Sequence, residues 1–181
     1  KAGGANMTFE ADGTVAIGYM AGKDIINAIG NTAVGYYTLH RNEYSDFNTA
    51  IGYQALINIG NADGSIKNTA VGSSALAAAS GADCTAVGYK AGFALTVQGQ
   101  RNTILGANAL ITDINGTRST AIGGQALYSQ ESSGGGSVDT GNTACGFAAG
   151  YHNVTGTNNT YLGAYAGSGV SGKSHSGCVF I

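Results

Sequence analysis

The side chains that could support acid–base or metal chemistry are few and scattered in this chain. Each of its three histidines, His40, His152 and His175, lies outside any repeated position. Only His40 has several charged neighbours, namely Arg41, Glu43 and Asp46. Catalysis and metal binding both require such groups to converge from several parts of the fold, and the sequence contains no such constellation. We therefore expect no enzymatic activity, no cofactor and no metal ion.

The three cysteines also lack the spacing of a reactive or metal-binding set. Cys84, Cys145 and Cys178 are far apart, and no C-x-x-C pair is present. Each occupies a position that other copies of a repeat fill with Asn, Val or Ile. We expect them to be small structural side chains without an intrachain disulfide.

A nine-residue motif, Asn-Thr-Ala-Val/Ile-Gly-x-x-Ala-Leu/Gly, organises the rest of the chain. Its central glycines recur nine times, at intervals of 16 to 23 residues. They are Gly18, Gly35, Gly52, Gly72, Gly88, Gly106, Gly123, Gly146 and Gly163. A unit of this length that repeats without a break predicts stacked coils of a solenoid.

The three residues before each glycine have the two-sided pattern of a short strand. Alanine predominates two before the glycine, and Val, Ile or Leu predominates one before it. Threonine stands three before all but the first glycine, at Thr32, Thr49, Thr69, Thr85, Thr103, Thr120, Thr143 and Thr160. The Thr and β-branched columns should therefore share one face of the strand, with the alanines on the other.

After the glycine we expect a sharp bend and then a second short strand ending in Ala-Leu or Ala-Gly, because glycine permits conformations closed to other residues. Within four residues of the nine glycines, Lys90 is the sole charged residue, so the linking segments should be surface loops. The predicted fold is an all-β parallel β-roll or β-solenoid of about nine to ten coils of ~17–18 residues. We expect the repeat domain to span 13–181 with its last repeat incomplete, and residues 1–12 to be a lead-in from a preceding segment.

Composition excludes several classes of protein. The formal net charge is −2 and the sequence has no Lys/Arg run, which disfavours nucleic acid as a partner. Its apolar runs fall short of the ~20 residues of a membrane span, so we expect no membrane insertion. With 31 glycines and no proline, the chain is not collagen-like.

Two copies of the motif resemble known repeats. Gly13-Thr14-Val15-Ala16-Ile17-Gly18 is similar to the Ser-Val-Ala-Ile-Gly signature of the YadA-like head repeat of trimeric autotransporter adhesins. The later form, from Asn48 to Leu56, more closely resembles repeats of bacteriophage tail-fibre proteins. The resemblance implies a left-handed parallel β-roll, three chains side by side and an extracellular location. Thr in place of Val and the longer, variable spacing favour the virion fibre over the adhesin.

A homotrimer can also be argued from the two faces of the strand. A roll buries one face internally, and the other face needs a partner. Because alanine lets backbones approach closely, we expect the alanine columns to line a symmetry axis between copies. The Asn column before the Thr column is expected to form a structural ladder.

Several surfaces could contact a ligand. If the Thr column is exposed, it could bind ice; if it lies in the core, it cannot. The aromatic residues after the glycines, such as Tyr19, Tyr36 and Tyr53, could stack on a glycan or pack at the turn or between subunits. The loop with Arg41, Glu43, Tyr44, Asp46 and Phe47 has the richest polar and aromatic mixture and is the predicted receptor loop.

The sequence thus predicts a non-enzymatic segment of a trimeric extracellular fibre. The favoured version is a bacteriophage tail fibre, part of a virion appendage, that contacts a glycan or protein receptor on the host surface. A bacterial trimeric adhesin or filament subunit on the cell surface is one alternative. A monomeric ice- or glycan-binding solenoid is another, of a different class.

Overall fold

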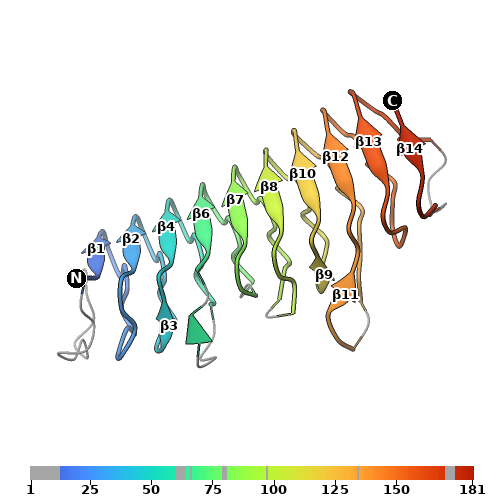
Figure 1. The fold of residues 1–181 in the computed structure, drawn as a ribbon. Helices are drawn as coiled ribbons and strands as arrows, with labels where there is room; N and C mark the ends of the chain where they lie inside the picture. Colours follow the sequence, from blue (N-terminus) through green and yellow to red (C-terminus); the bar gives the residue numbers. More distant parts are fainter. Residues whose placement is uncertain are drawn as a thin grey trace.

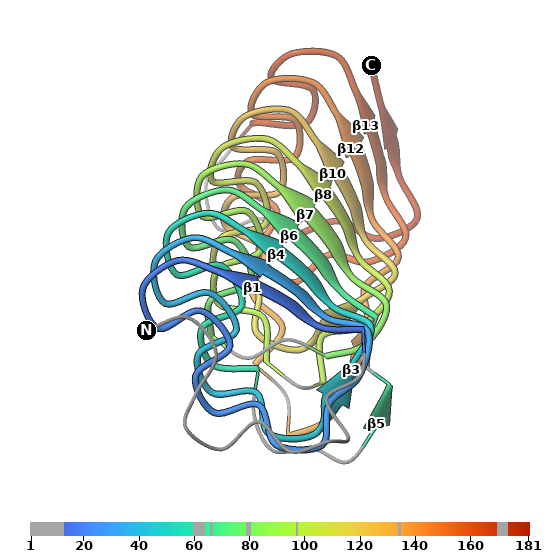
Figure 2. The ribbon, with the colours of Figure 1, turned by 90° about the vertical axis from the view of Figure 1, so that its left-hand side faces the viewer.

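The chain forms a parallel β-solenoid of about nine turns with no helix among the described residues, which confirms the predicted fold class. The structure is a computed structural model, and it describes residues 13–59, 64–65, 67–78, 81–96, 98–133, 135–169 and 174–181. The predicted lead-in, residues 1–12, lies outside them. The coils stack in chain order from one end of the molecule to the other (Figures 1 and 2).

One parallel sheet of ten strands runs the length of the described solenoid. Consecutive repeats pair without a register shift, so Thr32 lies opposite Thr49 and Ala33 opposite Ala50. The repeat therefore places each motif position in a straight column, which we number from the ladder glycine, the central glycine of each motif. The strands are β1 (Val15–Ile17), β2 (Thr32–Val34), β4 (Thr49–Ile51), β6 (Thr69–Val71), β7 (Thr85–Val87), β8 (Thr103–Leu105), β10 (Thr120–Ile122), β12 (Thr143–Cys145), β13 (Thr160–Leu162) and β14 (Val179–Phe180).

Two further strand pairs lie in the longer linking segments. β3 (Ser45–Asp46) pairs with β5 (Gly64–Ser65), and β9 (Gly116–Thr117) pairs with β11 (Val138–Asp139), both parallel. Figure 1 shows them at the lower end of the coils, below the strands of the main sheet. The length differences between repeats are thus absorbed on this side, and the main sheet stays regular.

The segment after each ladder glycine is a turn, so the prediction of a second strand there was wrong. Its second and fourth residues have left-handed backbones even where they are not glycine; in one coil Gln54 has φ 55° and Leu56 has φ 49°. A strand needs extended residues in succession, which this alternation prevents. The turns still stack, because the N–H of Gln54 donates to the preceding coil and that of Leu56 to the following one.

Each ladder glycine makes room for the backbone of the next coil. Gly123 has φ +125°, and a Cβ built on it would lie 2.4 Å from the carbonyl oxygen of Gly146. The same approach recurs at every ladder glycine from Gly18 to Gly146. No other residue fits this combination of a left-handed backbone and close approach.

The interior lies beneath the alanine column, which corrects the expectation that the alanines line an axis between copies. Ala33, Ala50 and Ala70 are completely buried within the chain's own core. The remaining volume is filled by leucines four residues after the ladder glycine, at Leu39, Leu56, Leu76, Leu110 and Leu127. The space between sheet and leucines is narrow, so alanine fits there where a larger residue would overpack.

The alanine column also contains three large residues, Ile104, Tyr161 and Phe180, and the first two confirm this account of the core. Ile104 and Tyr161 are buried, and each lies against glycines that replace the leucine four after the ladder glycine. A Cβ on Gly92 would lie 2.7 Å from Cδ1 of Ile104, and one on Gly150 or Gly167 would meet the ring of Tyr161 at 2.8 or 2.4 Å. Volume lost at one column is therefore regained at the other.

The Asn column caps the start of each strand from inside. The backbone N–H of Asn48 donates to Oδ1 of Asn31 (2.8 Å), and that of Asn68 donates to Oδ1 of Asn48 (3.0 Å). The side-chain amide of Asn68 donates to the carbonyl of Gly81 (2.8 Å). These asparagines are almost fully buried, so the ladder runs mainly between side chains and backbone and satisfies groups that water cannot reach.

Candidate functional site

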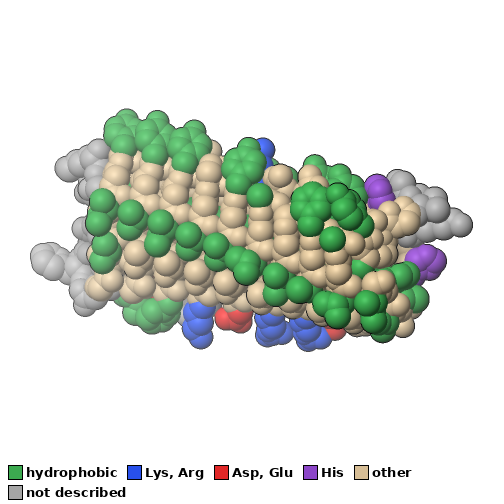
Figure 3. Space-filling view, turned by 90° about the horizontal axis from the view of Figure 1, so that it is seen from above, with side chains coloured by type: hydrophobic (Ala, Val, Ile, Leu, Met, Phe, Trp, Pro, Cys, Tyr) green, Lys and Arg blue, Asp and Glu red, His purple; other side chains and the backbone are tan. Residues whose placement is uncertain are grey.

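The main sheet presents its Thr and β-branched columns outward, a surface that we call the sheet face. Ile17, Leu105 and Leu162 are about half exposed, at 59%, 47% and 51%. Figure 3 shows this face, where a continuous band of hydrophobic side chains follows the long axis of the molecule. No charged residue occupies either column. A contiguous apolar surface of this length is characteristic of an interaction site.

The Thr column lies on the same exposed surface. Thr85, Thr103, Thr143 and Thr160 are exposed, and the other four are partly exposed. Among the described residues, none of these eight hydroxyl groups makes a hydrogen bond to another protein group. The hydroxyls are therefore available to water or to a partner, which meets the condition that ice binding requires.

Charged side chains border the sheet face along one edge, five residues before the ladder glycine (Figure 3). Lys67, Asp83, Arg101 and Arg118 occupy this column in successive coils, all exposed and all with left-handed backbones. An apolar strip with a charged border has the anatomy of a protein interface, with a dry centre and a polar rim.

The opposite border carries stacked tyrosines. Tyr36 lies between Tyr19 and Tyr53, with ring centroids 5.3 and 5.4 Å apart and planes nearly parallel. Burial among these rings, and their mutual repulsion when ionised, raises the pKa of Tyr36. Both faces of the Tyr36 ring are covered by other rings, so Tyr36 offers its edge and hydroxyl group rather than a platform for a sugar.

The predicted receptor loop is divided between structural contacts and solvent. Arg41 is exposed, while Glu43 and Tyr44 are partly buried. Asp46 lies in β3, and its Oδ1 accepts a hydrogen bond from the N–H of Ile29 (2.8 Å). The Phe47 side chain is half exposed at the charged edge of the sheet face. Its ring lies over Gly30, the residue at the same column position in the preceding coil.

His40 lies beside this loop but has the surroundings of a packed surface residue. Its ring stacks on Tyr37 at 4.7 Å, and its Nδ1 is 3.8 Å from Oδ2 of Asp24. Burial lowers its pKa, and this effect outweighs the opposing effect of the Asp24 carboxylate. Among the described residues, no three His, Cys, Asp or Glu side chains gather as a metal site would require.

A buried carboxyl group, which sequence reasoning missed, lies inside one coil. Asp113 is fully buried; its Oδ1 accepts from the N–H groups of Gly116 and Ser132, and its Oδ2 accepts from the amide of Gln130 at 2.6 Å. Burial raises its pKa in spite of these hydrogen bonds. Asn42 and Asn153 make the corresponding bond to the N–H three residues later, so Asp113 replaces a structural asparagine.

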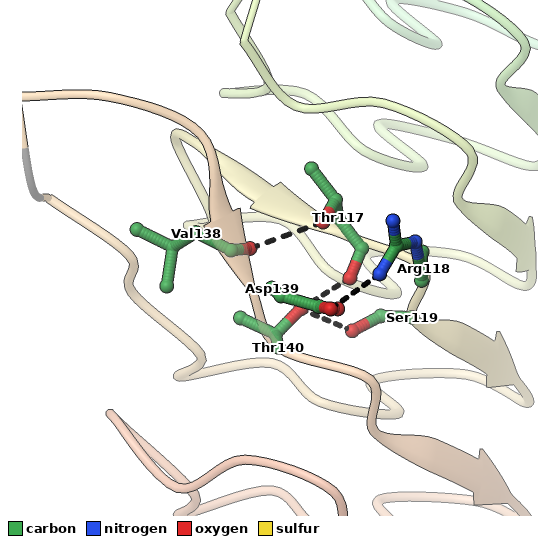
Figure 4. A network of polar contacts seen from close by, with 6 residues as sticks. All are labelled: Thr117, Arg118, Ser119, Val138, Asp139 and Thr140. Carbon is green, nitrogen blue, oxygen red and sulfur yellow. Dashed lines mark hydrogen bonds and ion pairs between the residues drawn. The ribbon is translucent and has the colours of Figure 1, made fainter.

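The strands beside Asp113 join a further polar network (Figure 4). Thr140 donates to the carbonyl of Thr117 and lies 2.8 Å from the Ser119 hydroxyl, all inside the coil. Arg118 and Asp139 form an exposed ion pair at the surface end of the network. Every one of these groups has a partner within the fold, which indicates a role in fixing two coils.

An open groove of about 410 Å³ lies near the C-terminal end, on the turns that follow the ladder glycines. Aromatic rings and uncharged polar groups line it: Gln125, Phe147, Ala148, Tyr151, His152, Tyr165 and Ser168. Phe147 and Tyr165 meet edge to face, with planes at 74°. These residues come from three successive coils, and the groove depends on the order of large and small residues along each column. A pattern of residue types with catalytic chemistry does not reveal such an order.

The cysteines are all free: Cys84 is buried, Cys145 exposed and Cys178 partly buried. Burial raises the pKa of the Cys84 thiol to about 11.

In the part of the chain that the structure describes, no helix is long and apolar enough to cross a membrane. Comparison of the chain with protein-family models, curated proteins and solved structures finds no match.

Proposed function

We propose that this chain is a non-enzymatic segment of a trimeric extracellular fibre that also carries receptor-binding surfaces. The observation that supports this most is the sheet face, which is free of charged residues and has an apolar column that runs beside the Thr column along the main sheet. At a strand spacing of ~4.8 Å, ten strands make it ~45 Å long. Apolar surface of this extent is costly to leave in water.

A second and third copy of the same chain are the occupants that suit this face. Its columns repeat with the spacing of the coils, and copies arranged around an axis parallel to the solenoid share that spacing. Every Thr and β-branched pair would then meet an equivalent residue at the same height. The orientation of the strand supports a contact through these side chains and not through the alanines, because the alanines are buried within the chain's own core.

The location follows from the resemblance of the repeat. Thr in place of Val and the longer spacing favour a bacteriophage tail fibre, where stiffness would come from the ladder and avidity from three copies. A bacterial surface adhesin or filament subunit is the alternative. In the intact protein, a self-cleaving chaperone domain would favour the phage, and a membrane-anchoring barrel would favour the adhesin.

The test is the molar mass in solution, measured by light scattering after size exclusion. We expect about three times 18.0 kDa. Val87→Glu would place a charge at the centre of the sheet face and should shift the mass to that of a monomer. Ser133→Glu adds the same charge at an exposed loop position and should leave the trimer intact. A wild-type chain that stays monomeric at the highest concentration reached would overturn the proposal.

The exposed hydroxyl groups of the Thr column favour one second candidate, a monomeric ice-binding solenoid. A flat ladder of Thr and β-branched residues at a constant spacing could order water against an ice surface. This candidate predicts a monomer that shows thermal hysteresis, which Thr85→Lys and Thr103→Lys should abolish. A trimer without hysteresis would exclude it, because the same face cannot be buried and bind ice.

A further inference from the structure

The groove near the C-terminal end exists because one long side chain is missing from a column. Two residues after the ladder glycine, Gln125 and Tyr165 flank Ala148 in neighbouring coils. The Ala148 side chain is 2% exposed and forms the bottom of the hollow between them. Its backbone, at φ 53°, matches that of Gln125 at 60°, so the hollow reflects side-chain size and not a different fold.

The groove contains an aromatic ring, Tyr151, that is stacked on a ring of its own column on one side only, and the ring of His152 lies nearly perpendicular to it with centroids 4.8 Å apart. Tyr151 stacks on Tyr128 with centroids 4.8 Å apart and planes at 5°, so one face of its ring is covered. In the next coil the same column holds Ser168, which is too small to cover the other face. Tyr36, by contrast, has a ring on each side.

The polar groups around that face can all form hydrogen bonds. Gln125 offers an amide, His152 an imidazole and Ser168 a hydroxyl, so the groove has both donors and acceptors. No Asp, Glu, Lys or Arg lines it. A ligand that suits this lining has an apolar face for the ring and several hydroxyl groups for its border, and it carries no net charge.

We propose that this groove binds a neutral saccharide, with the C–H face of one pyranose ring stacked on Tyr151 and its hydroxyl groups bonded to Gln125, His152 and Ser168. Its volume of about 410 Å³ lies within the ~300–1,000 Å³ of small-molecule sites and has room for a mono- or disaccharide. The hydroxyl pattern of the sugar would be selected by the three polar side chains. A charged sugar would find no counter-charge there.

This inference gives a chemical class to the receptor in the proposed function, but it does not depend on the trimer. The groove is on the turns after the ladder glycines, whereas the proposed contact between copies is the sheet face. Light scattering therefore tests the trimer, and saccharide binding tests the groove. A monomeric chain that binds sugar would refute the trimer and support the saccharide site in the groove.

The experiment is saturation-transfer NMR on the whole chain with glucose, galactose, mannose, N-acetylglucosamine, maltose and lactose, followed by calorimetry on any binder. We expect at least one to bind with a dissociation constant of about 1 mM, as for a shallow site with few contacts. Ala148→Gln should weaken binding at least tenfold, because it restores the side chain that this column carries at Gln54 and Gln125.

A second variant and a control keep the test independent of folding. Ser168→Tyr would extend the Tyr128–Tyr151 stack over the open face and should also weaken binding at least tenfold. Ser74→Gln makes the change of Ala148→Gln in the same column of a distant coil and should leave binding unchanged. Absence of binding by all six sugars, or equal binding by the filled variants, would overturn the proposal. So would binding of indole when no sugar binds, because the groove would then be a purely aromatic site.

Discussion

Replacing Gly123 by alanine tests whether the close approach of successive coils requires glycine. At this residue φ is +125°, and the added Cβ would lie 2.4 Å from the carbonyl oxygen of Gly146 and 2.6 Å from its carbon. Holding an alanine in such a backbone conformation costs ~1–3 kcal/mol. Forcing the next coil away adds ~1–3 kcal/mol of overpacking. We therefore expect Gly123→Ala to lower the free energy of unfolding by ~2–6 kcal/mol.

Two other glycines separate the contributions. Gly163 has φ +116° with nothing within 4 Å of its Cβ position, so Gly163→Ala should lose only the conformational ~1–3 kcal/mol. Gly124 follows Gly123 directly, but its φ lies outside the left-handed range and its Cβ would make an ordinary 3.4 Å contact with the ring of Phe147. Gly124→Ala should be neutral or stabilise by up to ~1 kcal/mol through the unfolded chain.

Thermal unfolding followed by circular dichroism, at one protein concentration, measures all three variants. A change of 1 kcal/mol shifts Tm by ~2–4 °C in a chain of this size, so Gly123→Ala should melt ~4–24 °C below the wild type. If Gly123→Ala and Gly124→Ala melted within ~2 °C of each other, less than the shift from 1 kcal/mol, the coils would relax freely and our account of the ladder glycine would be refuted.

Three further predictions concern the interior and the thiols. Burial raises the pKa of Asp113, so its contribution to stability should be lost as the pH rises past the ordinary value of 3.8. Asp113→Asn removes the charge but replaces the acceptor of the Gln130 amide by a donor, so the Tm of the variant relative to the wild type should be higher at neutral pH than in acid. A difference in Tm that does not change with pH would contradict this. Asn102→Ala leaves the N–H of Ser119 without its acceptor and should cost ~1–3 kcal/mol in urea unfolding, and no change in the midpoint would argue against the Asn ladder. Near neutral pH a thiol reagent should label Cys145, on the sheet face, at once in the monomeric Val87→Glu variant and Cys84, whose pKa is about 11, only on unfolding; equal rates in the folded variant would be inconsistent with the burial of Cys84.

The sequence predicted the main sheet well because one strand per repeat has a clear two-sided pattern. In-register pairing such as Thr32 with Thr49 follows from the repeat itself. The turns were mistaken for strands because nothing in Gln54 or Leu56 signals a left-handed backbone; hydrogen bonds to the coils on either side stabilise it. Such a conformation depends on stacking, which local sequence preferences do not describe.

The choice of inner face could not be made from the strand alone. Alternation shows that Ala50 and Ile51 point in opposite directions, and hydrophobicity favours burial of the isoleucine. The outcome depends on the space left by Leu56 on the other side of the coil, where alanine fits. The groove was missed for a similar reason, because its shape depends on small residues, Ala148 and Ser168, placed between large ones in neighbouring coils.

The matching of large and small residues across the core limits which coils can be exchanged. A coil with alanine in the strand and leucine in the turn is compatible with neighbours of its own kind, so it could be duplicated or removed and the rod would change in length by one strand spacing. The coil of Tyr161 is different, since its ring occupies the space left by Gly150 and Gly167. Moved between two leucine coils, it would have no room. Coils with alanine and leucine are therefore interchangeable, whereas the coils of Ile104 and Tyr161 fit only beside the glycines that make room for them. Recombination between repeats should preserve the fold among the former and disrupt it at the latter two.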